Sequence, residues 1–423
     1  MRIRRSLLAI FILSALGLLF VTCMNQDNTI AAMTDKRGKR YAGSEACASC
    51  HKNIHDSYVH TEHARTSWQV KDFPADIRKT SDTFYFSENN KVIIEKRDSG
   101  IFQVAYEGDA ATIAERFDIG FGSGEKAYTF GYWEGKNLNE LPLSYFTTIH
   151  QWANSPGFPK HKAYFERPII RRCFECHSSF VAPDLKQTES FSNVRKLDPA
   201  TVIYGIDCER CHGPATEHVS FHQQNPSVKK SHNMVSWKTL SRQQRLDVCG
   251  VCHSGNDLTT QFTTFAFKPG DTLSNFYYPE FGEAPPTPDV HGKQVQLLSA
   301  SKCFIKSNVL ECSSCHNNHD GKQKTMAVYS RQCINCHQDT KHPAALTASL
   351  GNAMTDKCID CHMPNEASNI IGFREKGKDE ISHYFLRTHK IAIYPEEVKK
   401  ILNELKNNKT AEGDLPVRRE GGK

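Results

Sequence analysis

Seven short motifs of two cysteines and a histidine are the residues of this 423-residue chain best suited to chemistry. In each motif two cysteines stand three positions apart, and a histidine directly follows the second cysteine. The amino-acid composition of the chain predicts about 0.03 such matches by chance, so the repetition is not accidental. In chain order, motifs 1 to 7 are Cys47–His51, Cys173–His177, Cys208–His212, Cys249–His253, Cys312–His316, Cys333–His337 and Cys358–His362.

The spacing C-x-x-C-H is typical of covalent attachment of a c-type haem. On a helical turn, positions i, i+3 and i+4 share one face. Two thiols on that face can bond to one edge of a porphyrin, and the histidine beside them reaches the iron as proximal ligand. We therefore predict seven covalently bound c-type haems, with proximal ligands His51, His177, His212, His253, His316, His337 and His362. The predicted attachment cysteines are Cys47, Cys50, Cys173, Cys176, Cys208, Cys211, Cys249, Cys252, Cys312, Cys315, Cys333, Cys336, Cys358 and Cys361.

Three other uses of paired cysteines fit less well. A zinc ribbon does not require a histidine after every second cysteine. A disulfide framework suits a short chain, and a thioredoxin-like pair is normally single and part of a βαβ unit. Only Cys23 and Cys303 lie outside the motifs, and Cys303 is expected to be a buried thiol near motif 5.

The N-terminus has the pattern of an export signal. Three arginines precede an apolar run of fifteen residues, Leu7–Val21, which is short for a membrane span. Residues 1–22 are therefore predicted to be a signal peptide or lipoprotein signal, and the protein is expected in the periplasm or at the outer membrane or cell surface. Three forms remain open: a lipid anchor at Cys23, a cleaved soluble protein and an uncleaved anchor.

The formal charge of +6 does not indicate a nucleic-acid partner. Without residues 1–22 the chain carries about +3, and seven haems add fourteen propionates and, when oxidised, seven ferric charges. The holoprotein then carries about −4 when oxidised and about −11 when reduced. Many lysines and arginines are expected to neutralise propionates, and no nucleic acid is expected to bind.

The remaining sequence predicts a mainly α protein with extensive loops, wrapped around a haem stack. Hydrophobic residues are only 39% of the chain, so the porphyrins are expected to supply much of the core. β-formers between turn signals predict a small antiparallel β element near residues 80–146. The other expected segments are a polar tether (24–40), a first haem segment (41–70), haems 2–4 (147–262), a Pro-rich connection (263–302), haems 5–7 with distal histidines (303–393), a C-terminal helix (394–410) and a disordered tail (411–423).

Each haem iron has a sixth position, and histidine is the best candidate for it. Beyond the N-terminal segment the chain has only Met234, Met326, Met354 and Met363, so seven methionine ligands are impossible. Thirteen histidines lie outside the motifs. His/His ligation should dominate, which predicts low-potential haems because methionine ligation raises the potential. Histidines a few residues after a motif, such as His218, are expected to ligate a neighbouring haem, although each could instead be a surface or propionate-binding residue.

Several stretches resemble the multihaem cytochrome c-552/c-554 family, which is related to hydroxylamine oxidoreductase and the pentahaem nitrite reductases. They are "YAGSEACASCHKNIHDSYVHTEHARTSW", "GIDCERCHGPATEHV", "DVHGKQVQLLSASKCF…LECSSCHNNHD" and "DKCIDCHMP…ISHYFLRTHKI". The resemblance covers about half the chain. The chain has seven motifs, whereas the best-known tetrahaem member has four, and it lacks the C-x-x-C-K site of the pentahaem nitrite reductases. By this resemblance the distal candidates are His63, His218, His291, His319, His342, His383 and His389.

Two functions follow from these features. In the first, the chain is a secreted heptahaem cytochrome that carries electrons through mostly bis-histidine haems. Its partners would be redox proteins: a quinol-side donor and a terminal reductase or surface acceptor in anaerobic respiration. In the alternative, one haem iron is open and the protein is an oxidoreductase acting on a small nitrogen or sulfur compound. No catalytic residue is nominated, and electron transfer is preferred over enzyme activity.

Overall fold

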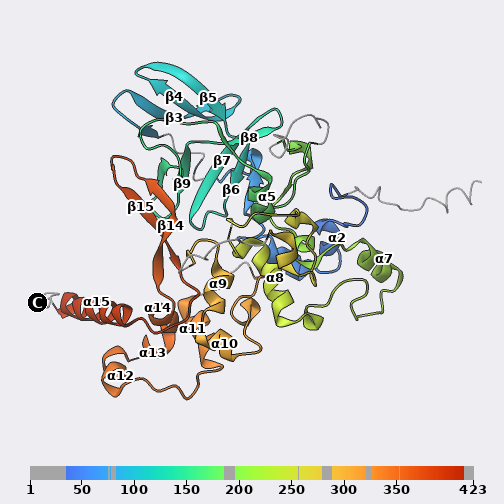
Figure 1. Ribbon diagram of the computed structural model, residues 1–423, viewed down its shortest axis with the longest axis vertical. Coiled ribbons are helices and arrows are strands. Elements are labelled where there is room, and N and C mark those ends of the chain that lie inside the picture. The colour runs from blue at the N-terminus through green and yellow to red at the C-terminus, as the bar shows by residue number, and fades with distance from the viewer. Residues whose placement is uncertain are drawn as a thin grey trace, which may run out of the picture.

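The computed structural model describes residues 35–74, 77, 82–184, 196–255, 257–278, 288–320, 325–351 and 353–413. All twenty histidines and fifteen of the sixteen cysteines lie in these ranges. The predicted signal (residues 1–22), Cys23 and most of the tether and tail lie outside the described residues. Figure 1 shows a β-rich part, with β3, β4, β5 and β7, above a part built from short helices.

The prediction of a mainly α protein is wrong. About 33% of the chain is helical and 24% is in strands, arranged in several antiparallel sheets. One reason is that the motif helices are very short, since α6 and α14 span five residues each. A second reason is that strands also form outside residues 80–146. The cysteine motifs in those regions led to the prediction of helices and loops only.

Two antiparallel sheets make up the β-rich part. The strands β2 (Thr83–Tyr85), β3 (Asn90–Arg97), β4 (Gly100–Glu107) and β5 (Ala110–Arg116) form a meander in that order. The second sheet has seven strands, and β9 pairs with both β7 and β10. Its strands are β1 (Ser67–Gln69), β6 (Ile119–Phe121), β7 (Ala127–Glu134), β8 (Asn137–Glu140), β9 (Leu143–Phe146), β10 (Gln151–Asn154) and β11 (Arg167–Pro168).

The largest apolar core lies between these sheets. Sixteen buried residues form it, from Trp68 to Phe165. Phe73, Phe117 and Phe130 stack with ring centroids 4.6–5.6 Å apart, and the Trp152 ring packs 5.3 Å from that of Phe130. Large aromatic side chains contribute most of the burial in such a core. The β-rich part therefore has a conventional hydrophobic core of its own.

The helical part has far less apolar core among the described residues. Two of its buried clusters contain four and three residues, around Val251 and Leu246 respectively. Its helices are α2 (Ser44–Ala48), α3 (Lys52–Tyr58), α5 (Arg171–His177), α6 (Cys208–His212), α7 (Thr216–Gln224), α8 (Arg242–His253), α9 (Gln294–Ser299), α10 (Lys302–Lys306), α11 (Met326–Ile334), α12 (Ala344–Leu350), α13 (Ala353–Asp356), α14 (Cys358–His362) and α15 (Pro395–Gly413). The 3-10 turns are η1 (Val70–Asp72), η3 (Pro199–Thr201), η4 (Trp237–Thr239), η5 (Thr264–Ala266), η6 (Leu273–Phe276) and η7 (Cys312–Ser314).

A hairpin near the C-terminus joins the two parts. Its strands are β14 (Asn365–Arg374) and β15 (Ile381–Arg387), and it rises from the helical part towards β9 in Figure 1. Phe373 stacks on Phe146 of β9 with ring centroids 3.9 Å apart, and Arg374 donates a 2.7 Å hydrogen bond to the Tyr85 carbonyl. A smaller pair, β12 (Ser178–Phe180) with β13 (Ile203–Tyr204), lies between motifs 2 and 3.

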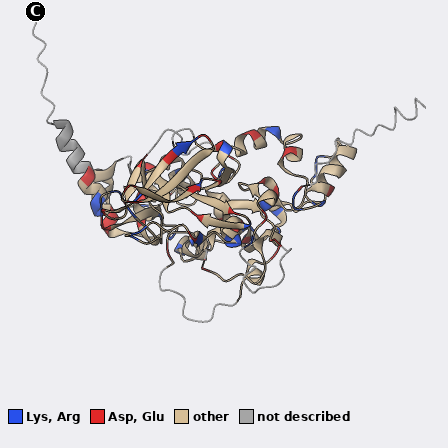
Figure 2. Ribbon diagram, turned by 90° about the horizontal axis from the view of Figure 1, so that it is seen from above, with Lys and Arg blue, Asp and Glu red and all other residues tan. Residues whose placement is uncertain are grey.

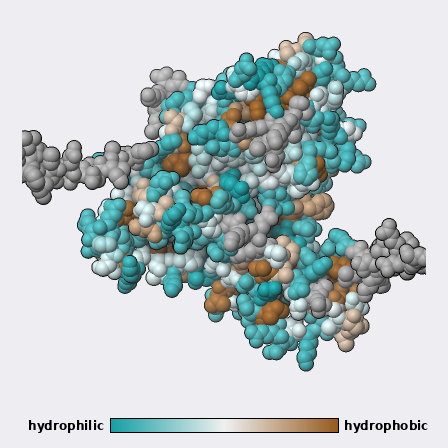
Figure 3. All heavy atoms as spheres, turned by 180° about the vertical axis from the view of Figure 1, so that it is seen from behind, coloured by the Kyte–Doolittle hydropathy of each residue, from teal (hydrophilic) through white to brown (hydrophobic). Residues whose placement is uncertain are grey.

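Charged residues of both signs are interspersed along the ribbon (Figure 2). On the face seen in Figure 3, apolar atoms form separate patches among hydrophilic ones. In the part of the chain that the structure describes, every helix is too short or too polar to cross a lipid bilayer.

Candidate haem sites

Each motif folds as a single helical turn. The His51 amide donates to the Cys47 carbonyl at 2.8 Å, and motifs 5 and 6 have the same cysteine-to-histidine bond at 3.0 Å. Motifs 2, 3, 4 and 7 lie within α5, α6, α8 and α14. Both thiols and the histidine of a motif therefore share one face, as covalent haem attachment requires. All fifteen described cysteines are free thiols.

Four of the predicted proximal histidines face a second histidine at the separation that a haem iron would need. The ring centroids are 6.1 Å apart for His63 and His253, 5.8 Å for His212 and His319, 6.1 Å for His316 and His389, and 6.3 Å for His342 and His362. A bond of about 2.0 Å from a metal to an imidazole nitrogen, plus roughly 1.1 Å from nitrogen to ring centre, puts two axial rings about 6.2 Å apart. These residues therefore fit a bis-histidine haem.

Two of these pairs cross between motifs. His319 follows motif 5 by three residues but faces His212 of motif 3, and His342 follows motif 6 but faces His362 of motif 7. Both histidines would thus tie a neighbouring haem to their own segment. A fifth candidate, His291, lies close enough to His177 to lower its pKa electrostatically.

Desolvation by the surrounding protein favours the neutral form of five of these imidazoles. Desolvation lowers the pKa of His177, His253 and His389 to about 4 in each case. The same cause lowers the pKa of His63 and His212. Only a neutral imidazole has a lone pair to give to a metal, so these five histidines are in the form that ligation needs.

Backbone carbonyls fix the orientation of three of the candidate ligand rings. Nδ1 of His362 lies 2.7 Å from the Ala392 carbonyl, Nδ1 of His218 lies 2.8 Å from that of His232, and Nδ1 of His383 lies 2.9 Å from that of Ser368. Because a carbonyl only accepts, Nδ1 carries the proton and Nε2 keeps a free lone pair. In the described residues, however, no proximal histidine ring is paired with His218 or His383.

Thiols of different motifs lie next to one another. Cys47 of motif 1 contacts Cys208 of motif 3, Cys176 of motif 2 contacts Cys252 of motif 4, and Cys249 of motif 4 contacts Cys312 of motif 5. Electrostatic interactions also link Cys211 to Cys249, Cys315 to Cys336, and Cys333 to Cys358. The motifs therefore form one connected series, 1–3–4–5–6–7, with motif 2 attached at motif 4.

Residues between the paired cysteines hold the motifs together, and sequence reasoning missed them. Glu209 of motif 3 accepts hydrogen bonds from the amides of Ala42, Gly43 and Ala215 at 2.8–2.9 Å. Arg37 lies 3.1 Å from the same carboxylate and 2.5 Å from that of Asp207. The only sequence signal for these contacts is that charged residues occupy the two positions between the cysteines of motif 3.

The next residue of motif 3 makes similar contacts. Arg210 is only 9% exposed and donates to the carbonyls of Thr264 and Glu175 at 2.7 and 2.9 Å. Glu175 is itself an intervening residue of motif 2, and Arg172 beside it donates to the Val251 carbonyl inside motif 4. Motifs 2, 3 and 4 are thus fixed to each other by buried hydrogen bonds.

Gly205 holds the backbone that carries His63, which leads to a prediction. Its φ of +65° lies in the left-handed region, and a Cβ there would collide with the Ala64 carbonyl oxygen. The adjacent Ile206 amide donates 2.9 Å to the His63 carbonyl. We expect Gly205→Ala to lower the free energy of unfolding by at least about 1–3 kcal/mol, which denaturation measures. We also expect it to displace His63, which the axial-ligand signature in electron paramagnetic resonance spectra measures.

Gly135→Ala is the matched control for that change. Gly135 has a similar φ of +61°, but a Cβ there would meet nothing within 4 Å. It should cost stability through backbone strain alone and leave every haem spectrum unchanged. A Gly205→Ala protein with the same spectra as this control would contradict the prediction.

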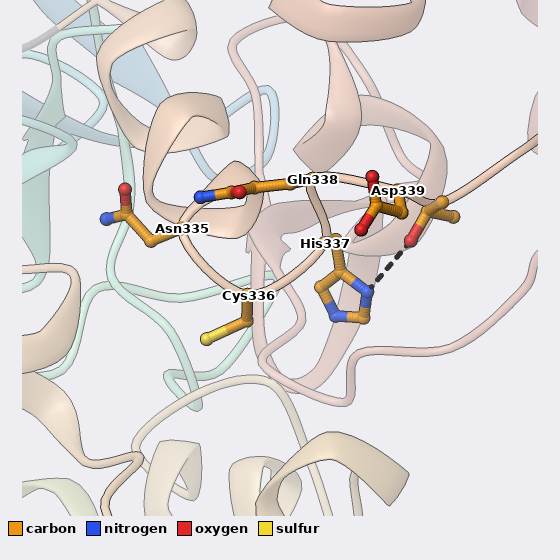
Figure 4. Close-up of a pocket in the computed structure, with 6 residues that line it drawn as sticks. Asn335, Cys336, His337, Gln338 and Asp339 are labelled. Atoms are coloured by element: carbon orange, nitrogen blue, oxygen red, sulfur yellow. Dashed lines mark hydrogen bonds between the residues drawn. The ribbon is translucent and has the colours of Figure 1, made fainter.

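Motif 6 opens onto a hollow in the surface. The hollow has a volume of about 440 Å³ and is lined by Asn335, Cys336, His337, Gln338, Asp339 and Thr340. Figure 4 shows the His337 ring and the Cys336 sulfur pointing towards the same open side, with the His337 Nδ1 hydrogen-bonded at 3.2 Å to Thr340. Ile305 and Val309, near motif 5, are 64% and 76% exposed. Open space and apolar side chains beside the motifs fit a porphyrin.

A comparison with protein-family models agrees with a cytochrome. Residues 150–213, which include motifs 2 and 3, match the family model described as cytochrome c554 and c-prime. Among solved structures, the chain is similar to an outer cell wall cytochrome, OcwA, with 16% identity and a TM-score of 0.49 over 86% of this chain and 82% of that one. No curated protein matches the chain.

Proposed function

We propose that this multihaem c-type cytochrome, whose residues 150–213 match the cytochrome c554 and c-prime family, carries electrons through seven covalently bound haems. The observation that carries the proposal is the set of four histidine pairs whose rings lie 5.8–6.3 Å apart. Haem iron supplies one-electron ferric–ferrous chemistry when bound. The chain's part is to hold each iron, to exclude other ligands and to keep the haems close together.

The distal histidines set both reactivity and potential. An iron held between two imidazoles has no position left for substrate, so it can only exchange electrons. Histidine rather than methionine in the sixth position keeps the potential low. We assign His63 to the haem of motif 4, His319 to motif 3, His389 to motif 5, His342 to motif 7 and His291 to motif 2.

The contacts between motifs support a branched route for electrons. Thiols attach along porphyrin edges, so neighbouring thiols bring neighbouring haem edges together. The series 1–3–4–5–6–7 would be the main path, and the haem of motif 2 would be a side branch at motif 4. Motif 4 is the junction, because thiols of motifs 2, 3 and 5 all interact with it.

Redox proteins are the partners that this function implies. We propose a quinol-side donor and a terminal reductase or surface acceptor, reached in the periplasm or at the outer membrane or cell surface. The arginine-rich start and the apolar run Leu7–Val21 support export, and Cys23 would carry a lipid anchor if the protein is a lipoprotein.

The test combines a haem count with a ligand replacement. Intact mass of the holoprotein should give seven haems. In the His63→Met variant, one haem in seven should titrate at a higher potential, with a shift on the order of 100 mV, because methionine replaces histidine as axial ligand. Potentiometric titration followed by absorbance measures this.

His60→Met is the matched control, since His60 is exposed and is not a distal candidate. Its titration curve should overlay that of the natural protein. Fewer than seven haems, or a His63→Met curve indistinguishable from the control, would contradict the proposed ligation.

A further inference from the structure

Thr66 makes two hydrogen bonds to the predicted proximal histidine of motif 2, from which it is separated by 111 positions. Its hydroxyl donates to the His177 carbonyl at 2.8 Å, and the same oxygen lies 3.3 Å from Nδ1 of the His177 ring. A hydroxyl has one proton, and here the carbonyl takes it, because a carbonyl oxygen only accepts. The Thr66 oxygen therefore accepts from the ring, which places the ring proton on Nδ1 and leaves Nε2 free for an iron.

The seven-stranded sheet fixes the position of Thr66. This residue directly precedes β1, which pairs with β6. The amide of Gly122, directly after β6, donates a 2.7 Å hydrogen bond to the Thr66 carbonyl. On the other side, Ser67 is 2% exposed, and its hydroxyl lies 2.7 Å from that of Ser178, the residue after His177. These bonds on both sides of Thr66 hold its backbone against motif 2.

The His177 ring is also held by its other neighbours. The Phe121 ring lies edge-on to it, with ring centroids 6.0 Å apart, and packs 5.4 Å from the ring of Phe174 in α5. Figure 1 shows α5 beside β6. Desolvation is the main cause of the lowered pKa of His177, and an interaction with the Thr66 backbone opposes it. Thr66 therefore contacts the ring through both its backbone and its hydroxyl.

The same segment of chain reaches the site of motif 4. The Thr66 amide lies 3.4 Å from the carbonyl of His63, whose ring faces that of His253 at 6.1 Å. One turn of four residues thus contacts the predicted proximal ligand of motif 2 and carries the distal candidate of motif 4. These are the two motifs that Cys176 and Cys252 also bring together.

We propose that Thr66 is a positioning residue for the haem of motif 2: its hydroxyl orients the His177 ring towards the iron and lowers the reduction potential of that haem. This role rests on the proposed function, because it requires a haem at motif 2 with His177 as proximal ligand. An acceptor on Nδ1–H makes an imidazole a better donor through Nε2, and a better donor stabilises ferric iron more than ferrous iron. A lower potential at the side branch favours transfer of an electron from this haem to the junction at motif 4.

Replacement of Thr66 by valine and by serine separates the hydroxyl from the shape of the side chain. Thr66→Val keeps the β-branched shape and the backbone but has no oxygen, so one haem in seven should titrate at a higher potential. We expect a change of up to tenfold in its ferric-to-ferrous ratio at a fixed potential, or about 59 mV. Thr66→Ser keeps the hydroxyl and should titrate as the natural protein does. Potentiometric titration of the holoprotein, followed by absorbance and electron paramagnetic resonance, measures these curves.

Thr112→Val is the matched control. Thr112 lies in β5, in a sheet that carries no motif, and its hydroxyl donates to the Ala105 carbonyl at 3.2 Å. The titration curve of this variant should overlay that of the natural protein. Cys173→Ala/Cys176→Ala, which lacks the motif 2 haem, locates the effect. In that background Thr66→Val should change none of the six remaining potentials.

Three results would overturn the role of Thr66. Equal curves for Thr66→Val and the natural protein would show that the hydroxyl does not act on an iron. An equal shift in Thr66→Val and Thr66→Ser would show that packing is responsible. A shift that persists without the motif 2 haem would place the effect at another haem.

Two further measurements keep the test decisive. If the double cysteine variant does not mature, the comparison of valine with serine decides, because both of those variants keep every motif. Thr66→Ala, which also lacks the oxygen, replaces Thr66→Val if the valine variant does not mature. Intact mass separates these results from failure of the proposed function, which would show as fewer than seven haems in the natural protein.

Discussion

Replacement of Glu209 by alanine is expected to lower the free energy of unfolding of the holoprotein by about 3–5 kcal/mol. The Glu209 side chain is 1% exposed and accepts hydrogen bonds from three backbone amides and from Arg37. Its removal leaves buried donors without an acceptor and weakens the ion pairing of a guanidinium whose side chain is only 5% exposed. Each buried unsatisfied donor costs roughly 1–3 kcal/mol. Denaturant unfolding followed by absorbance and circular dichroism measures the change.

The same substitution should loosen one specific contact between motifs. Glu209 joins residues 37–43 to motif 3, so motif 1 should become accessible to protease before the rest of the chain. Glu45→Ala is the control, because Glu45 is exposed in α2 of the same segment, and it should change stability by less than about 0.5 kcal/mol. Equal stabilities for the two variants would show that the buried carboxylate does not hold the motifs together.

The sequence offers more direct signals for the candidate sites than for the fold. The C-x-x-C-H spacing predicts attachment cysteines and proximal histidines because the chemistry is local to one helical turn. The distal partners are a long-range property: His63 precedes His253 by 190 positions, and no local pattern encodes that distance. The resemblance to a family supplied the candidates, and only the fold could bring His319 to His212 rather than to its own motif.

The sequence overestimates the helix content because β-formers beside the motifs are interpreted as part of the haem region. The stretches "NEASNIIGFR" and "ISHYFLR" contain β-formers, yet they follow motif 7 and precede a distal candidate, so the sequence places them in the haem region. Their pairing as a hairpin depends on packing against Phe146, 227 residues earlier than Phe373. The contacts of Glu209 and Arg210 were missed for the same reason, since burial of a charge is decided by residues distant in sequence.

The chain made without haem attachment should fold only in its β-rich part. The core between the two sheets has sixteen buried residues, including Trp152, Phe117 and Phe130. Each fully buried large apolar side chain stabilises by about 1.5–3 kcal/mol, so this core can offset the entropy of ordering its strands. The clusters around Val251 and Leu246 contain only four and three buried residues and cannot do so without the apolar mass of the porphyrins.

Amide hydrogen exchange of the full chain, produced without export and with its cysteines kept reduced, measures this difference. Strands β3, β4, β7 and β9 should retain slow exchange, whereas α6, α8 and α14 should exchange at rates near those of an unfolded chain. Helix α5 should lie between them, because its Phe174 belongs to a cluster of eight buried residues shared with Ile119 of β6 and Leu138 of β8. The holoprotein, protected in both parts, is the control.

The pattern of protection separates two ways of building such a protein. Protected motif helices in the haem-free chain would mean that the hydrogen bonds of Glu209, Arg210 and Arg172 suffice to order them. Loss of protection in the strands as well would mean that the sheets depend on the haem region through the β14–β15 hairpin, where Phe373 and Tyr384 join the cluster of Phe146 and Ala153. The sizes of the clusters favour independent sheets and haem-dependent helices, because burial is concentrated where the motifs are absent.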